Sequence, residues 1–365
     1  MVFIVILEYI FYIISFLFVF LFLGYGILIR LMIGGAKHSL YDFSPKITVI
    51  IPTLNEEHYI KGKIQNILEQ DYPKDMMRII VSDSMSSDMT AKIARTFRKV
   101  SVIDARKGKI LALNDAIDSA KTEVIVINDA DTFLEKGAIK MCVSRLGDSS
   151  IGGVTGFSVM KPSKNIYSKG KINYHKNDWN LRSSESDVDT CCGMDGKLIA
   201  FKKSVVPFIS EDAYADDFEM TLAIRKKGLR CVVEKKAVLS ETPPSDVSNE
   251  IKQMRRRTVL SILTIFRHRD MLFNPRYSYY GMLILPFRRL FPLFLPFMAA
   301  YAFLFLAFFH PIIFYIVTAI SVLAAVLSSS VRYAAILMVS ITLSWIDILK
   351  GRYSSGDVWE KIVRS

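Results

Sequence analysis

Residues 2–29 restrict the fold more than any other part of the sequence, because they contain a single charged side chain, Glu8. The run is longer than the roughly 20 apolar residues that cross a bilayer as a helix. A secretory signal has a basic start and an apolar core of only about 7–15 residues, and this run has neither feature. We therefore predict a retained transmembrane helix within residues 1–33. The alternative is a helix buried in a protein core.

A second apolar zone extends from about residue 281 to residue 349, in blocks near 290–309, 311–329 and 331–349. In the whole chain 51% of the residues are hydrophobic and 22% are charged, so the two kinds must be segregated. Residues 45–270 have the composition of a soluble domain. We predict an interfacial segment at 281–297 and two to three transmembrane helices within 278–349. For the last block a buried core helix is again the alternative.

Lysine and arginine residues indicate on which side of the membrane the soluble domain lies. Arg30 and Lys37 follow the first apolar run, and arginines crowd the approach to the second apolar zone. We therefore predict that the domain lies on the cytoplasmic face, with its basic rim against anionic lipid. The basic tail, residues 350–365, is also predicted to lie on the cytoplasmic side. This requires an even number of membrane crossings after the soluble domain, although three apolar blocks are present. The crowded arginines are Arg255, Arg256, Arg257, Arg267, Arg269, Arg288 and Arg289.

The net charge of +12 does not by itself indicate nucleic acid. The basic residues lie beside apolar segments and are not interleaved with an aromatic platform on which bases could stack. We therefore predict the membrane bilayer, and no nucleic acid, as the partner of this charge.

Strands and helices alternate through the first part of the soluble domain. This alternation predicts an α/β fold with a mostly parallel, doubly wound sheet that is covered by helices on both faces. In such sheets ligands bind beyond the carboxyl ends of the strands. The expected strands are 46–53, 77–84, 99–104 and 123–131, and the expected helices are 56–70, 86–97 and 107–120.

Polar side chains follow three of these strands at their carboxyl ends. Asn55 and Glu56 follow the first strand, Asp83 the second, and Asp129 and Asp131 the fourth. Carboxylate oxygens suit Mg²⁺ or Mn²⁺, which bind through one or two carboxylates together with substrate phosphate. A metal held in this way would neutralise a departing diphosphate, which points to a nucleotide-activated donor. The alternative for the two aspartates after the fourth strand is an ordinary solvated turn.

An ordered set of motifs in residues 50–257 resembles the membrane-bound members of glycosyltransferase family 2, which are inverting enzymes with a GT-A fold. The resemblance covers nearly all of the soluble domain, and the apolar zones fit the same subgroup. The motifs are IPTLNEE, VSDSMSSDMT, GKILALNDAI, NDADT, GMDGKLIAFKKS, YADDFEMTLAIRKKG, ETPPS and QMRRR.

The resemblance implies a nucleotide-sugar donor and assigns residues to it. Asp83 would contact the nucleotide base, although the turn carries Met85 and Met89 where the family has glycines. Its alternative role is to cap the helix that begins near Asp88. Asp131 would bind the metal, and Asp129 the nucleotide sugar and the metal's waters. The other predicted donor-binding residues are Pro52, Asn55, Glu56, Lys109 and Asn114; Lys109 could instead be a solvated lysine at a helix start.

The resemblance also implies catalytic and acceptor residues. Asp217 matches the general base and Asp216 its neighbour, in a segment that could otherwise be only the acidic first turn of a helix. Gly193 and Gly196 match a glycine-rich stretch on the acceptor side, with a simple strand and turn as the alternative. Gln253, Arg256 and Arg257 match the acceptor and diphosphate motif, although Arg257 replaces its tryptophan. A membrane-surface basic cluster is the alternative for these arginines.

These features together predict a metal-dependent inverting glycosyltransferase that acts on a lipid or lipid-linked acceptor. The missing tryptophan and the small number of membrane spans argue against a processive polysaccharide synthase, which is the second candidate. A third possibility is a non-catalytic membrane protein with a degenerate nucleotide-binding domain, which the missing glycines and tryptophan favour. The presence of Asp83, Asp129, Asp131 and Asp217 favours the enzyme, because a non-catalytic protein has no reason to keep all four.

Overall fold

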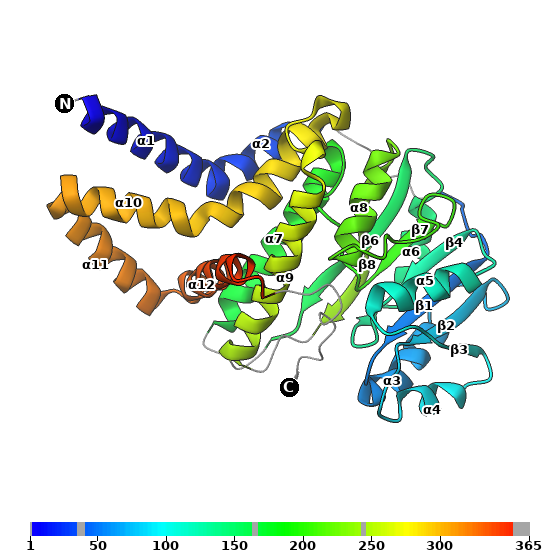
Figure 1. Ribbon diagram of the computed structural model, residues 1–365. Coiled ribbons are helices and arrows are strands. Elements are labelled where there is room, and N and C mark those ends of the chain that lie inside the picture. The colour runs from blue at the N-terminus through cyan, green and yellow to red at the C-terminus, as the bar shows by residue number, and fades with distance from the viewer. Residues whose placement is uncertain (1, 35–40, 163–166, 242–245, 353–365) are drawn as a thin grey trace.

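The computed structural model describes residues 2–34, 41–162, 167–241 and 246–352, which form a mixed sheet flanked by helices, with apolar helices projecting to one side (Figure 1). The order of the eight described strands in the sheet is β3-β2-β1-β4-β7-β6-β8-β5. They are β1 (Ile47–Thr53), β2 (Met77–Asp83), β3 (Val100–Asp104), β4 (Val124–Ile127), β5 (Phe133–Leu134), β6 (Ile151–Met160), β7 (Ile199–Lys202) and β8 (Arg230–Glu241).

Helices precede, separate and follow these strands. Those before and within the sheet are α1 (Val2–Val19), α2 (Tyr25–Leu31), α3 (Glu57–Leu68), α4 (Thr90–Arg95), α5 (Lys109–Ser119), α6 (Ala138–Arg145), α7 (Ser168–Val188) and α8 (Asp216–Lys226). Those after it are α9 (Val247–Arg267), α10 (Leu295–Phe309), α11 (Pro311–Leu327) and α12 (Ser329–Leu349).

The first four strands confirm the predicted parallel sheet. β1 pairs in parallel with β2 and β4, and β2 pairs in parallel with β3. Successive residues of β1 face opposite sides: Val49 packs in one core with α3, α4 and α6, and Ile50 packs in the other with α5, α7 and α8. A strand buried on both faces is apolar at most positions, which explains the apolar run at 49–51, and the buried Thr48 shares a hydrogen bond of 2.7 Å with Thr122.

The sheet changes direction at β4, which is parallel to β1 but antiparallel to β7. Beyond it, β6 is antiparallel to β7 and parallel to β8, while β5 is antiparallel to β8. Because β1 is flanked by β2 on one side and β4 on the other, the crossovers run in opposite directions from it. This is the position at which open α/β sheets form a ligand crevice.

A third core joins the soluble domain to the apolar helices. Tyr25 and Ile29 of α2 lie in it with Phe218 of α8, Ile262 of α9 and Ile284 of the second apolar zone, and each side chain is almost fully buried. Figure 1 shows α7 and α9 between the sheet and the apolar helices. The apolar helices therefore belong to one folded unit with the sheet.

Three described helical runs are long and apolar enough to cross a membrane: Ile4–Leu31, Tyr280–Phe309 and Ser329–Leu349. Pro311–Leu327 is apolar but shorter. The predicted interfacial segment, 281–297, is the start of the second run, where Arg288 pairs with Asp178 and Glu185 of α7 at 2.5 Å each. The predicted domain limits and crossing number stay predictions; Lys37 and tail residues 353–365 lie outside the described residues.

The acidic residue in the last apolar helix has a partner in the soluble domain. Asp347 of α12 forms an ion pair with Arg255 of α9, and the Ser344 hydroxyl donates to the carbonyl of Arg255 at 3.1 Å. At the other end of α12, a Cβ added to Gly170 of α7 would lie 2.1 Å from the Ser329 carbonyl oxygen. A glycine is therefore needed where these two backbones meet.

We predict that Gly170→Ala lowers the free energy of unfolding, because two backbones cannot move apart as a flexible side chain can. The expected loss is about 1–3 kcal/mol, as for other overpacked sites. Gly26→Ala is the matched control, because a Cβ added to Gly26 meets nothing within 4 Å. Thermal unfolding of the full chain in detergent measures both; equal midpoints for the two variants would contradict the close approach of α7 and α12.

Candidate active site

Most of the predicted site residues line one cleft, with a volume of about 800 Å³, at the carboxyl ends of β1 and β4. They come from both halves of the sheet and from α5, α8 and α9, so segments far apart in the sequence meet there. The predicted residues in the lining are Pro52, Glu56, Lys109, Asp129, Asp131, Gly196, Asp216, Asp217, Gln253, Arg256 and Arg257.

Lys109 connects two groups of these residues. It follows Gly108, whose φ of 115° is a conformation that side chains rarely adopt, and it is the first residue of α5. Its Nζ lies 3.2 Å from Oδ1 of Asp129 and 3.1 Å from Oδ2 of Asp216. Burial alone would lower the pKa of Lys109, but these carboxylates outweigh it and raise the pKa well above its usual range. The ammonium group therefore stays charged.

Asp129 and Asp131 follow β4 directly, as predicted. Burial raises the pKa of Asp129 to about 6, and Asp131 adds to this while Lys109 opposes it. Within the described residues no three His, Cys, Asp or Glu side chains are grouped to hold a metal ion by themselves. Two carboxylates that lack a third protein ligand fit a Mg²⁺ or Mn²⁺ ion whose remaining ligands are phosphate and water.

Lys63 is a residue of this region that the sequence analysis missed. It is fully buried, and its Nζ donates to the Thr132 carbonyl, directly after the aspartate pair. Burial lowers the pKa of Lys63 to about 7, while Asp129 and Asp131 act in the opposite direction. The burial of Lys63 could have been predicted from the sequence, because Lys63 lies one helical turn from Ile60 and Ile67 on the apolar face of the predicted helix.

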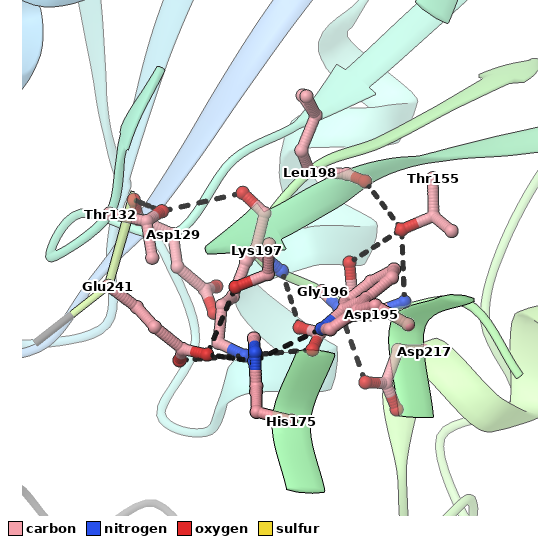
Figure 2. Close-up of polar contacts among 12 residues, drawn as sticks. Asp129, Thr132, Thr155, His175, Asp195, Gly196, Lys197, Leu198, Asp217 and Glu241 are labelled. Carbon is pink, nitrogen blue, oxygen red and sulfur yellow. Dashed lines mark hydrogen bonds and ion pairs between the residues drawn. The ribbon is translucent and has the colours of Figure 1, made fainter. Parts of the chain in front are cut away.

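Asp217 lies in the first turn of α8 beside the glycine-rich loop. The backbone N–H of Gly196 donates to Asp217 Oδ2 at 3.2 Å (Figure 2). Burial, followed by Asp216 and Asp195, raises the pKa of Asp217, and these effects outweigh Lys109 and the Gly196 N–H. A carboxylate with a raised pKa is a stronger base. A Cβ on Gly196 would lie 3.3 Å from Nζ of Lys109, so the glycine leaves room for the lysine.

A network of ion pairs supports the other side of this loop. Lys197 Nζ lies 2.8 Å from Asp195 Oδ2 and 3.0 Å from Glu241 Oε2, and His175 of α7 contacts the same glutamate at 2.5 Å (Figure 2). The network ties the loop to α7 and to the end of β8. The sequence analysis assigned no role to these four residues.

Asp83 and Asn55 are not among the residues that line the cleft. Asp83 is 4% exposed and accepts hydrogen bonds from the Thr53 hydroxyl at 2.9 Å and the Ser86 N–H at 3.0 Å. Asn55 Oδ1 accepts from the Ser87 N–H at 2.8 Å. Both side chains hold together the turns after β1 and β2, and their predicted contact with the nucleotide stays a prediction.

Asn114 and Gly193 are also absent from the cleft lining. The Asn114 amide exchanges two hydrogen bonds of 2.7 Å with the backbone of Ile209, in the segment before α8. The Gly193 carbonyl accepts from Arg182 at 2.9 Å, and a Cβ at Gly193 would lie 2.2 Å from Arg289. Arg182 and Arg289 do line the cleft, and the sequence analysis did not select them as site residues.

The fold and the cleft define the class of GT-A glycosyltransferases. The chain belongs to the family described as glycosyltransferase like family 2, whose sequence profile matches residues 45–259. The mannosyltransferase PcManGT of Pyrobaculum calidifontis, solved with GDP-Man and Mn²⁺, has the same fold. The TM-score is 0.76 at 24% identity, over 94% of this chain and 99% of that one.

Two curated relatives are glycosyltransferases by name. One is the dolichyl N-acetyl-α-D-glucosaminyl phosphate 3-β-D-2,3-diacetamido-2,3-dideoxy-β-D-glucuronosyltransferase of Methanococcus voltae, 27% identical over 57% of this chain. The other is the probable glycosyltransferase YdaM of Bacillus subtilis, 28% identical over 50% of this chain. The matched segments span 70% of the first relative and 47% of the second.

Met85, which stands where the family has glycine, keeps a left-handed backbone with a φ of 61°. We predict that Met85→Gly raises the free energy of unfolding by about 1 kcal/mol, because glycine adopts this φ without steric cost. Met85→Val should lower it, since a β-branched residue is strained there. The side chain is 69% exposed, so packing changes little in either variant. Chemical denaturation of both variants in detergent tests this; equal stabilities would contradict the assigned turn.

Proposed function

We propose that this glycosyltransferase moves a sugar, with inversion, from a nucleotide-sugar donor to a hydroxyl group of a membrane-embedded lipid or lipid-linked acceptor. Asp217 acts as the general base. The observation that carries the proposal is that Asp129, Asp131, Asp216 and Asp217 line one cleft although they come from two separate segments of the chain. One pair suits the metal and diphosphate, and the other suits the reacting hydroxyl.

Asp131 and Asp129 would hold Mg²⁺ or Mn²⁺ at the donor's diphosphate. The metal would neutralise charge on the leaving nucleoside diphosphate. PcManGT, whose solved complex contains GDP-Man and Mn²⁺, supports this donor class. Lys109, already between Asp129 and Asp216, can carry positive charge to the same phosphates.

The surroundings of Asp217 support its role as the general base. The acceptor hydroxyl oxygen forms a bond to the anomeric carbon as the bond from that carbon to the diphosphate breaks, and the hydroxyl proton passes to a carboxylate. Asp216 is engaged by Lys109, whereas Asp217 has no ion pair with any described residue. Its raised pKa favours accepting the proton.

The lining of the cleft supports a lipid acceptor. α9 contributes Gln253, Arg256 and Arg257, and Arg289 comes from the second long apolar run, so the cleft opens next to the apolar helices. The name of the Methanococcus voltae relative, a transferase acting on a dolichyl phosphate sugar, agrees with this class. The arginines beside the apolar runs support a cytoplasmic active site.

We predict that Asp217→Asn lowers turnover by about 100-fold or more, because general base catalysis contributes about that much. Asp118→Asn, on an exposed part of α5, is the matched control. The measurement is release of nucleoside diphosphate by the purified full chain with Mn²⁺, acceptor lipids and a panel of nucleotide sugars. One added sugar distinguishes the proposal from a polysaccharide synthase, which would give a ladder of products.

Stability separates a catalytic role of Asp217 from a structural one. A carboxyl whose pKa is raised on folding makes the folded state less stable as pH rises through that pKa. Asp217→Asn should therefore unfold at or above the wild-type temperature at pH 7, with the difference vanishing below about pH 4, where aspartate is protonated in both states. Parallel loss of stability and activity, or nearly full turnover, would refute the assignment of Asp217 as base.

A further inference from the structure

A second cavity, of about 210 Å³, adjoins the cleft on the side of the apolar helices. It lies between α7, α9, the Arg288–Arg289 pair and Tyr333 of α12. The two cavities share the lining residues Arg182, Asp195, Lys197, Gln253, Arg257 and Arg289. A molecule bound in the second cavity would therefore touch the same side chains as one bound in the cleft.

Six lysine and arginine side chains line the second cavity, and most of them have carboxylate partners. Among these pairs, Arg182 lies 2.7 Å from Asp178 and Lys197 lies 2.8 Å from Asp195, while Lys171 contacts Glu250 and Arg288 contacts Asp178. The charges of these four cations are already balanced by carboxylates of the protein, so they need no ligand.

Two cations of the cavity, Arg257 and Arg289, form no ion pair within 4 Å in the described part of the chain, although Asp195 and Glu241 act on Arg257 from farther away. Arg257 forms neither a hydrogen bond nor an ion pair there and is exposed to the cavity. Arg289 donates from Nε to the Cys192 carbonyl at 3.1 Å and stacks over the Phe218 ring at 4.6 Å. Both guanidinium groups remain available to an anion, and the planar fork of arginine suits phosphate oxygens.

Gln253 gives an independent indication of a ligand. Its side chain is 5% exposed and lines both cavities, yet no hydrogen bond to another described residue satisfies its amide. The amide faces both cavities, so a ligand with hydrogen-bonding oxygens can pair with it there. Gln253 and Arg257 lie one turn apart on α9, so one ligand can reach both.

We propose that the second cavity binds the phosphate or diphosphate group of a lipid-linked acceptor, through Arg257, Arg289 and Gln253. This assignment rests on the proposed function, because it places the acceptor's lipid chain along the apolar helices and its reacting sugar hydroxyl at Asp217. The phosphate is recognised and not attacked, so the need for a base remains. The acceptor class is thereby narrowed to sugars linked to a lipid through phosphate, and neutral glycolipids are excluded.

The test measures binding without a donor, using the full chain in phosphatidylcholine nanodiscs and isothermal calorimetry. The probes are farnesyl phosphate, farnesol and inorganic phosphate. We expect farnesyl phosphate to bind at least about 10-fold more tightly than farnesol or inorganic phosphate. A 10-fold difference in Kd corresponds to about 1.4 kcal/mol, which one good charged contact can supply. Arg257→Gln should weaken farnesyl phosphate about 10-fold or more, and Arg289→Lys should weaken it as well, because the planar fork is lost.

Arg276→Gln is the matched control, because Arg276 is exposed near the apolar zone and lies in neither cavity. Arg257→Gln should unfold at the wild-type temperature, so a loss of binding can be read directly. The assignment would be overturned if farnesol or inorganic phosphate bound as tightly as farnesyl phosphate. It would also be overturned if Arg276→Gln and Arg257→Gln lost equal affinity for farnesyl phosphate. An enzyme that binds farnesyl phosphate but transfers no sugar would overturn only the proposed function.

Discussion

The cleft depends on one ammonium group that lies between carboxylates of two different parts of the fold. Lys109 Nζ is 3.2 Å from Asp129, which follows β4, and 3.1 Å from Asp216, which begins α8. Asp131 and Asp217 lie beside these two acids, and like charges in a partly buried site repel one another. Lys109 offsets that repulsion and holds the two halves of the cleft together before any metal or phosphate is bound.

The apolar helices pack as one unit with the domain that carries the cleft. They share a core with α8 and α9, and Arg288 and Arg255 form ion pairs across the boundary. Arg289 reaches the cleft from an apolar run whose other end extends away from the sheet (Figure 1). In the proposed function, an acceptor bound there would meet the apolar helices and the reacting residues at the same time.

The sequence allowed prediction of the parallel half of the sheet and of most of the cleft, because both follow from local patterns. Mostly apolar runs marked the buried strands, and Asp129 and Asp131 lay at a strand end where a ligand crevice was expected. The polar helix α7 gave no apolar period and was not predicted. Lys63 and Arg289 were missed as well, because their importance depends on neighbours tens of residues away in the chain. Asp83 and Asn114 were assigned to the donor from motif position, although their side chains bond mainly to backbone and turn residues.

The location of the bound metal tests the central claim most directly. Crystals of the full chain soaked with Mn²⁺ and nucleoside diphosphates would show the ion by its anomalous scattering. We predict one peak in the cleft, in contact with Asp131 at the carboxyl end of β4, with the diphosphate toward Lys109. A peak bound elsewhere, with the nucleotide outside the cleft, would contradict it.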